Sequence, residues 1–457
     1  MELIIYICFG LIWFLLGYKF LNPSHKKFHT WILSLFIFTV ISGRIPAPFL
    51  HKTIELWMIL GIVFLPLSIV MILRKDFITK FSGHLRSVSY SYSLGIYFTI
   101  FIASSLIYSQ LFTPKGTFGY ILIGLLIFSL LFYLYLFNYN NKFIDSSNII
   151  ISNIIFSTFI ICIIGLIAQF TIFIKLFSCS SFSFFHPEGD IHCVPIGLTT
   201  IYRFSIGSNI NEFSFYILLA YILLDQREED IAFPSPIKIL RNKKLIKSTF
   251  LFCGLLSLSR AWIIGILLYY LTENFIKILN NITIKSSDIF NLSINLKKIS
   301  LYKLIFYSLI FSIFLESFRR YNEYILYIFN SRFQFLINPE LILEGSSSLS
   351  RLNLLEKHQD LISSMGFLPI LAPGSGTSFH NSFLQLALEA GLPCAFFALF
   401  LLLLLIIKKP KLGIPPLIFL ASHHILYNPI MWLYFWSISN PSKYDLLLNK
   451  NRYSEVK

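Results

Sequence analysis

Residues 149–174 read IIISNIIFSTFIICIIGLIAQFTIFI, a stretch without a single Asp, Glu, Lys or Arg. As an α-helix it would be ~39 Å long, which is enough to cross the ~30 Å hydrocarbon layer of a membrane. Backbone polar groups cannot stay unpaired in hydrocarbon, so an apolar run of this length is typical of a membrane-spanning helix. The stretch predicts a span over 149–176 and indicates the class of fold.

The composition of the whole chain agrees with this interpretation. Of its 457 residues, 56% are hydrophobic and only 13% are charged, whereas about a quarter of the residues in a soluble domain are charged. A single water-soluble core is therefore excluded. Together with 149–176, the apolar runs predict an all-α polytopic membrane protein with about 11–12 transmembrane helices in one integral membrane domain over 1–457. The other runs are 3–21, 28–43, 54–73, 90–112, 117–137, 213–224, 247–271, 300–316, 383–407 and 412–438.

The net charge of +15 arises from 37 Lys and Arg against 22 Asp and Glu. Because these basic residues lie in short loops between apolar runs, they follow the positive-inside rule, and the expected partner is the lipid bilayer and not nucleic acid. Residues 1–21 lack a basic segment before their apolar stretch, so we expect an uncleaved first helix. With the basic loops on the cytoplasmic side, 177–212 and the large loop 317–382 are extracytoplasmic. The loops predicted to be cytoplasmic carry Lys26 and Lys27; Arg74, Lys75, Lys80 and Arg86; Arg241, Lys243, Lys244 and Lys247; Lys297 and Lys298; and Lys408, Lys409 and Lys411.

Two of the six cysteines, Cys179 and Cys193, share the polar loop 177–212. A disulfide between them would close a loop of about fifteen residues and would stabilise the protein by roughly 3 kcal/mol in an oxidising compartment. A zinc site with His186 and His192 is a second interpretation, and two free thiols are a third. These alternatives remain open at the level of sequence.

A polar pair, Ser259-Arg260, interrupts the apolar run 247–271 near its middle. A buried arginine in the centre of a membrane helix is costly unless it lies in a wet cavity or at a break. Splitting the run into two half-helices also restores an even number of spans between the basic loops on either side. We therefore expect a break at Ser259-Arg260, although one helix with a paired arginine would also explain the sequence.

The segment 372–391 carries the densest group of residues suited to chemistry. Pro373, Gly374 and Gly376 predict a turn whose N–H groups could face an anion or a sugar. His380-Asn381 follows at the mouth of an apolar helix, where a histidine could remove a proton from an attacking hydroxyl. The plainer interpretation is that Asn381 caps the helix beside a histidine without a role. Farther along, the stretch 389–393, which reads EAGLP, predicts a local helix break with Glu389 turned away from lipid.

These motifs together resemble the O-antigen ligase and Wzy-type polymerase superfamily. The resemblance covers roughly 200–410 and rests on Leu-Ser-Leu-Ser-Arg at 256–260, an outer loop with Arg351, the Gly-Ser-Gly of 374–376, His380-Asn381 and Glu389-Ala-Gly391. Arg203-Phe-Ser-Ile-Gly207, followed by Asn211-Glu212, is similar to a further outer-loop motif of that family. Ile210 replaces the proline that usually precedes this asparagine, and the span 213–224 is short.

The resemblance implies a polysaccharide transferase of the bacterial inner membrane, with its site facing the periplasm. The donor would be a glycan on undecaprenyl pyrophosphate, and the acceptor a glycan or a lipid A core. By this resemblance His380 activates the acceptor hydroxyl, while Arg260, Arg203 and Arg351 hold the pyrophosphate. Ser259, Gly374, Gly376 and Asn381 would line the same site. Guanidinium groups can neutralise a leaving pyrophosphate without a metal ion, so we expect inverting transfer without a cofactor.

Two other functions fit parts of the sequence. A repeat-unit polymerase needs the same base as a ligase and the same arginines to bind the pyrophosphate. A lipid-linked glycan flippase is expected to place ionisable residues along several spans and to show two related halves, but the charges here gather near the outer loops and Arg260. The sequence thus favours a ligase-like transferase, with the polymerase and the flippase as alternatives.

Overall fold

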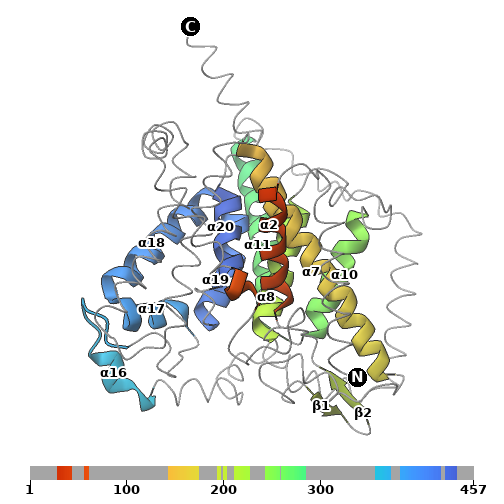
Figure 1. The fold of residues 1–457 in the computed structure, drawn as a ribbon. Helices are drawn as coiled ribbons and strands as arrows, with labels where there is room; N and C mark the ends of the chain where they lie inside the picture. The colour runs from red at the N-terminus through yellow and green to blue at the C-terminus, as the bar shows by residue number, and fades with distance from the viewer. Residues whose placement is uncertain are drawn as a thin grey trace.

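The computed structural model describes residues 28–43, 56–60, 143–173, 193–196, 199–202, 210–226, 242–257, 259–284, 356–371, 381–423 and 428–439. This part of the chain is mostly helical, and its long helices run in roughly one direction through the molecule (Figure 1). Its helices are α2 (Phe28–Ser42), α7 (Phe143–Phe173), α8 (Ile210–Asp225), α10 (Lys243–Leu256), α11 (Arg260–Ile284), α16 (Gln359–Ser363), α17 (Ser382–Ala390), α18 (Leu392–Lys408), α19 (Pro410–Ser422) and α20 (Pro429–Ser439). A β-hairpin, β1 (Cys193–Ile196) and β2 (Thr199–Tyr202), completes it.

One helix of the described part, α7, contains a stretch long and apolar enough to cross a membrane, Ile150–Phe170. This helix includes the stretch 149–173 of the predicted span 149–176. The predicted span 28–43 coincides with α2, and the predicted short span 213–224 lies inside α8. The predicted spans 3–21, 90–112, 117–137 and 300–316 lie outside the described residues, and only 56–60 of the span 54–73 are described, as helix.

Helix α8 is the centre of the core. All of its residues from Phe213 to Leu224 are buried, and α7, α10, α11 and α19 pack around it. A helix that is apolar on every side is stable only when protein or lipid surrounds it completely. Its tyrosines supply the polar contacts, because Tyr216 accepts a hydrogen bond of 2.6 Å from Asn428 Nδ2.

Helices α10 and α11 form an antiparallel hairpin around the turn at 257–259. Asp225, at the end of α8, contacts both Lys247 in the second turn of α10 and Tyr269 of α11, so both helices leave the turn toward the same end of the molecule. The predicted break at Ser259-Arg260 is confirmed. The prediction of two half-helices is wrong for the second one, because α11 is 25 residues long.

Helix α17 meets α18 at a sharp corner, as the segment 389–393 predicts. Gly391 at the corner has a φ of 90° and a ψ of 157°, a conformation essentially restricted to glycine. A Cβ atom at Gly391 would overlap the backbone oxygen of Phe367. The preceding loop closes the corner, because the N–H groups of Ile370 and Leu371 both donate to the Leu388 carbonyl, at 2.8 and 3.0 Å.

The prediction of one span over 412–438 is wrong. Helix α19 ends at Ser422, and α20 begins at Pro429 and returns, since Tyr434 of α20 donates to the carbonyl of Leu412 at 2.7 Å. Pro429 disfavours a helical conformation for Asn428, the residue before it, which agrees with a new helix that begins at Pro429. Asn428 instead caps α20, accepting from the N–H of Ile430 at 2.9 Å.

Candidate functional site

The turn before α11 is built by serines and one glycine. The Ser257 hydroxyl donates to the Gly254 carbonyl at 2.6 Å, and Ser259 Oγ accepts from the N–H of Trp262 at 3.4 Å, as a helix cap does. A Cβ atom at Gly254 would overlap the indole of Trp262. Glycine thus lets the indole lie directly against α10, and the turn places Arg260 at the first position of α11.

Arg260 is half-buried at the N-terminus of a long helix. The partial positive charge of a helix N-terminus disfavours a cation there and favours an anion. No acidic side chain occupies the first turn of α11. An anion bound at this point would therefore interact favourably with both the guanidinium group and the end of the helix.

The first turn of α17 is anchored by Asn381 and Ser382. Asn381 Oδ1 accepts from the N–H groups of Phe383 and Leu384, both at 3.0 Å, so the capping interpretation holds for this oxygen. The side-chain NH₂ group keeps its two donors for another partner. Ser382 is buried and donates to the backbone carbonyl of His423 at 2.7 Å, which ties the start of α17 to the end of α19.

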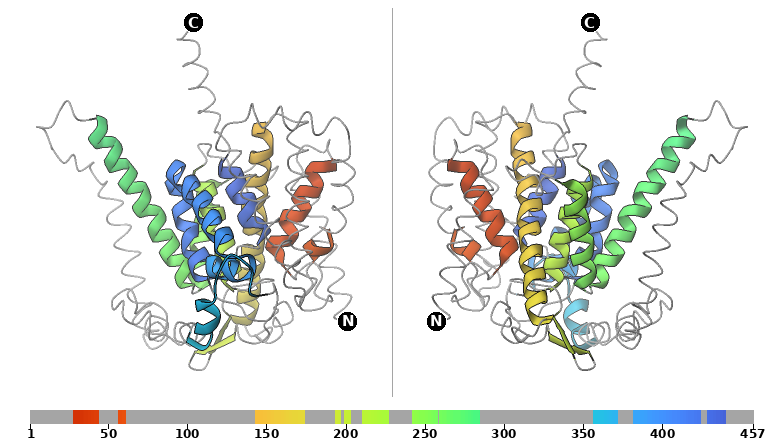
Figure 2. Two further views of the ribbon diagram at one scale, coloured as in Figure 1. Left: turned by 90° about the vertical axis from the view of Figure 1, so that its left-hand side faces the viewer. Right: turned by 90° about the vertical axis from the view of Figure 1, so that its right-hand side faces the viewer.

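The antiparallel packing of α11 and α19 brings these two turns to the same end of the molecule. Lys411 Nζ lies 3.8 Å from Glu273 Oε1, and a methyl group at Gly265 would lie 3.6 Å from Ile418 Cγ2. Continuing about five residues, or ~7.5 Å along each axis, leads from Gly265 to Arg260 and from Ile418 to His423. Ser259 and Arg260 therefore lie at the level where Ser382 contacts His423. In Figure 2 this is the lower end, on which α16 and the β-hairpin also lie.

A buried polar pair continues from the start of α17 toward its corner with α18. Gln385 donates to Glu389 Oε1 at 2.6 Å, and only 1% of Glu389 is exposed. The prediction that Glu389 does not face lipid is confirmed. A buried carboxyl group needs such hydrogen bonds, because an isolated charge is very costly in an apolar interior.

The remaining predicted site residues are Arg203, Arg351, Gly374, Gly376, His380 and Cys179, and they lie outside the described residues. Of the loop 177–212, the structure describes the hairpin, in which Cys193 pairs with Tyr202, and the start of α8. His380 directly precedes Asn381 in the chain. Among the described residues, no group of three or more His, Cys, Asp or Glu could hold a metal ion.

The sequence did not indicate that Ser382 and His423 belong to this end of the molecule. His423, which we expected inside a span, is the C-cap of α19, with an extended backbone and only 7% exposure. Its neighbour His424 lies outside the described residues. The dipeptide Asn428-Pro429 is the signal in the sequence that could have revealed the start of a new helix, α20.

A second polar cluster lies at the opposite end of α8. Asp225 Oδ1 pairs with Lys247, and Oδ2 accepts from the Tyr269 hydroxyl at 2.5 Å. Burial raises the pKa of Asp225, but the hydrogen bonds from Lys247 and Tyr269 lower it by a larger amount. The pKa of Asp225 therefore lies below its ordinary value. Lys243 and Lys411 lie near this end as well. The described lysines of two predicted cytoplasmic loops thus lie at the end opposite Arg260.

The chain matches no protein-family model, no curated protein and no solved structure at a significant level. The resemblance to O-antigen ligases and polymerases is therefore an interpretation of the sequence motifs alone.

Proposed function

We propose that the chain is a polytopic membrane glycosyltransferase that moves a glycan from undecaprenyl pyrophosphate to an acceptor hydroxyl at the periplasmic face of a bacterial inner membrane. The observation that supports the proposal is that two motifs, far apart in sequence, lie at the same end of the bundle. Ser259-Arg260 begins α11 and Asn381-Ser382 begins α17 at the same level. His380, the proposed base, is the residue before Asn381.

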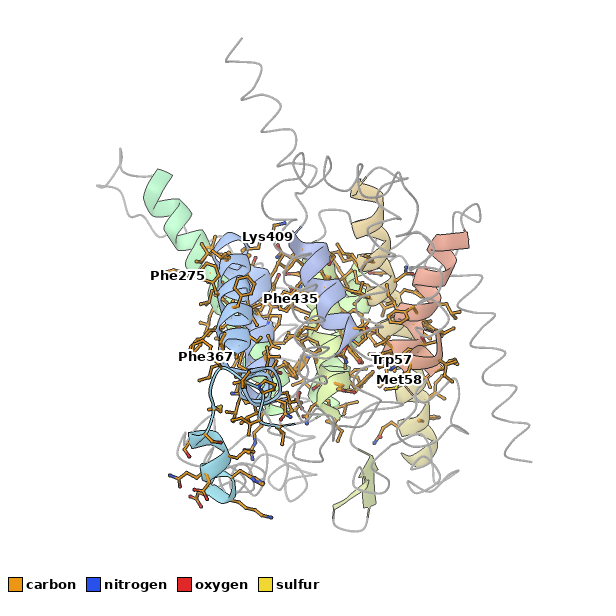
Figure 3. All side chains as sticks on the ribbon, turned by 60° about the vertical axis from the view of Figure 1, so that its left-hand side comes forward. Trp57, Met58, Phe275, Phe367, Lys409 and Phe435 are labelled. Carbon is orange, nitrogen blue, oxygen red and sulfur yellow. The ribbon has the colours of Figure 1, made fainter. Side chains whose placement is uncertain are left out.

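Two features support the membrane part of the proposal. Large apolar side chains are exposed on the outer helices, with Leu271 and Phe275 on α11 and Phe396 and Ile407 on α18. Figure 3 shows Phe275 on the outer side of the helices, and so many exposed apolar groups suit a lipid surface better than water. Lysines at one end and the candidate site at the other agree with the positive-inside rule, with the site facing outward.

The proposed chemistry uses each residue for one task. His380 takes the proton of the acceptor hydroxyl as its oxygen attacks the anomeric carbon of the donor sugar. The bond to the pyrophosphate oxygen breaks with inversion, and Arg260, Arg203 and Arg351 stabilise the charge on the leaving diphosphate. A planar guanidinium group can bind such an anion through two parallel hydrogen bonds, which a lysine cannot do. No metal ion or other cofactor takes part in this proposal.

The ligase-like form is proposed first. A polymerase would use the same groups, but its acceptor would be another repeat unit. The shape of the outer loops would then decide which acceptor binds. Complementation separates them, with one strain that lacks its ligase and one that lacks its polymerase. The chain should restore the ligase strain, and Arg260→Ala and His380→Ala should each lose this rescue.

The matched control removes a positive charge elsewhere. Lys244 is exposed near the opposite end of the bundle, so Lys244→Ala should rescue fully. Full rescue by either site variant would remove that residue from the mechanism. If neither strain is rescued, labelled lipid-linked glycan in vesicles tests the flippase, which would move label between leaflets without forming a new glycosidic bond.

A further inference from the structure

The loop at 366–371, which follows α16, carries two neighbouring apolar side chains that the fold leaves exposed. Phe367 is 84% exposed and Leu368 is 58% exposed, whereas Pro369 and Leu371 of the same loop are buried. Scattered single apolar residues are common on protein surfaces, but adjoining ones that form a continuous patch indicate an interaction surface.

This loop is bonded to the corner between α17 and α18 on both sides of the exposed pair. The Gly366 carbonyl accepts from the N–H of Leu392 at 2.9 Å, and the N–H of Ile370 donates to the Leu388 carbonyl at 2.8 Å. A loop that is bonded at both ends has a defined shape and does not fray as a chain terminus does. The fold therefore holds Phe367 and Leu368 at the surface.

The loop continues an apolar face of α18. The exposed residues of this helix include a row that we call the outer face of α18, which consists of Phe396, Phe400, Leu403 and Ile407. Spacings of three and four residues place them on one side of the helix. Leu392, which donates to the loop, precedes Phe396 by four residues and so begins the same row. Figure 3 shows Phe367 on the outer side of the helices, as is Phe275.

Charged residues border this patch on the side of α16. Glu356, Lys357 and Asp360 are all exposed, and a charged side chain is costly in hydrocarbon. Between Asp360 and Phe367 the exposed surface thus changes from charged to apolar. Such a change, at the end of the molecule that carries α16 (Figure 2), is expected where a protein passes from water into lipid.

We propose that Phe367 and Leu368 insert into the outer leaflet, at the boundary between headgroups and acyl chains, and anchor the corner of α17 and α18 there. This inference rests on the proposed function, because it uses the membrane location proposed above. The partner is lipid, since the pair continues the outer face of α18, which that proposal assigns to acyl chains. Helix α17 has nine residues, or ~13 Å. The anchor therefore keeps Asn381 near the headgroups, where the diphosphate of a lipid-linked donor would lie.

Spin labels test the depth of the loop directly. Phe367→Cys would carry a nitroxide label in proteoliposomes of phosphatidylethanolamine and phosphatidylglycerol, and Ser363→Cys, at an exposed position of α16, is the matched control. Wild-type protein treated with the same reagent gives the background from native cysteines. Oxygen concentrates in the acyl chains, whereas a nickel chelate stays in water. We expect the ratio of oxygen to nickel collisions to be severalfold higher at position 367 than at position 363.

A third label, on Phe400→Cys in the outer face of α18, reports the membrane location itself. Equal ratios at positions 367 and 363, with position 400 reached only by oxygen, would overturn the anchor and leave the membrane location intact. A label at position 367 that neither reagent reaches would show that a second copy or another protein covers the loop, which would also overturn the anchor. Nickel collisions at position 400 would instead contradict the membrane location of the proposed function, so the two failures are distinguishable.

Discussion

The indole of Trp262 lies directly against the α-carbon of Gly254, across the turn that joins α10 to α11. This contact fixes the angle at which Arg260 leaves the turn. Gly254→Ala would force the indole away, and overpacking of this kind typically costs about 1–3 kcal/mol. We expect a lower melting temperature in detergent and weaker rescue of the ligase strain. Gly366→Ala is the control, because the nearest atom to its added methyl group would be 4.0 Å away. An equal melting temperature for both variants would contradict the contact.

Gly391→Ala should disrupt the corner between α17 and α18. A φ of 90° with a ψ of 157° costs a residue with a side chain about 1–3 kcal/mol, and the new Cβ atom would also overlap the oxygen of Phe367. The loop at 366–371 should then detach from the corner. Limited proteolysis would show this as faster cleavage after Phe367. Unchanged cleavage would show that the loop is held by other contacts.

Asn381 allows helix capping to be separated from substrate binding. Asn381→Ala removes the acceptor for two N–H groups and should cost about 1 kcal/mol of stability. Asn381→Asp keeps this acceptor and should restore the stability. If the side-chain NH₂ group binds substrate, the aspartate variant will be stable and inactive. Thermal unfolding and transfer measured on the same samples decide between the two roles, and full activity of Asn381→Asp would leave only the cap.

Ser382→Ala should destabilise the protein by roughly 1–3 kcal/mol, because it leaves the buried carbonyl of His423 without this donor. Ser363→Ala removes an exposed hydroxyl that bonds within α16, and it should change stability by less than about 0.5 kcal/mol. Chemical unfolding of both variants measures the difference. Equal stabilities would show that the link between α17 and α19 contributes little.

Asp225→Asn should destabilise the opposite end of the bundle in a pH-dependent way. The pKa of Asp225 is lowered in the folded protein, so the stabilisation is present above the ordinary value of about 3.9 and is lost as the pH falls through the folded value. The difference in melting temperature between wild type and variant should be constant near pH 7 and should shrink below about pH 4. Glu273→Gln, which loosens a weaker pair at 3.8 Å, is the control. A difference that grows in acid would contradict the sign.

The sequence predicted the helix breaks where a polar or conformational signal interrupts an apolar run. Ser259-Arg260 and Gly391 were found because arginine is costly in a membrane helix and glycine ends one. The break after Ser422 was missed because run length alone joined two apolar helices across His423 and Asn428. The length of the apolar run also underestimated α11. The run ends at 271, but the helix continues through more polar residues to Ile284.

The sequence predicted only part of the candidate site, because some of its contacts depend on how distant helices pack. Residue types suited to phosphate and proton transfer can be recognised one motif at a time, which identified Arg260 and Asn381. That Ser382 contacts His423 depends on the pairing of α17 with α19, and no local pattern encodes it. The hairpin of β1 and β2 was likewise hidden within a polar loop, since pairing between strands so short leaves little signal.

The complete enclosure of α8 has a consequence for the biogenesis of the protein. Its neighbours include α19, which is synthesised almost two hundred residues later. When α8 leaves the ribosome, most of the surface that will cover it does not yet exist. Other surfaces must shelter this helix until the C-terminal part arrives, and in the proposed membrane location lipid would do so, so truncation before α19 should leave a chain that is open to degradation.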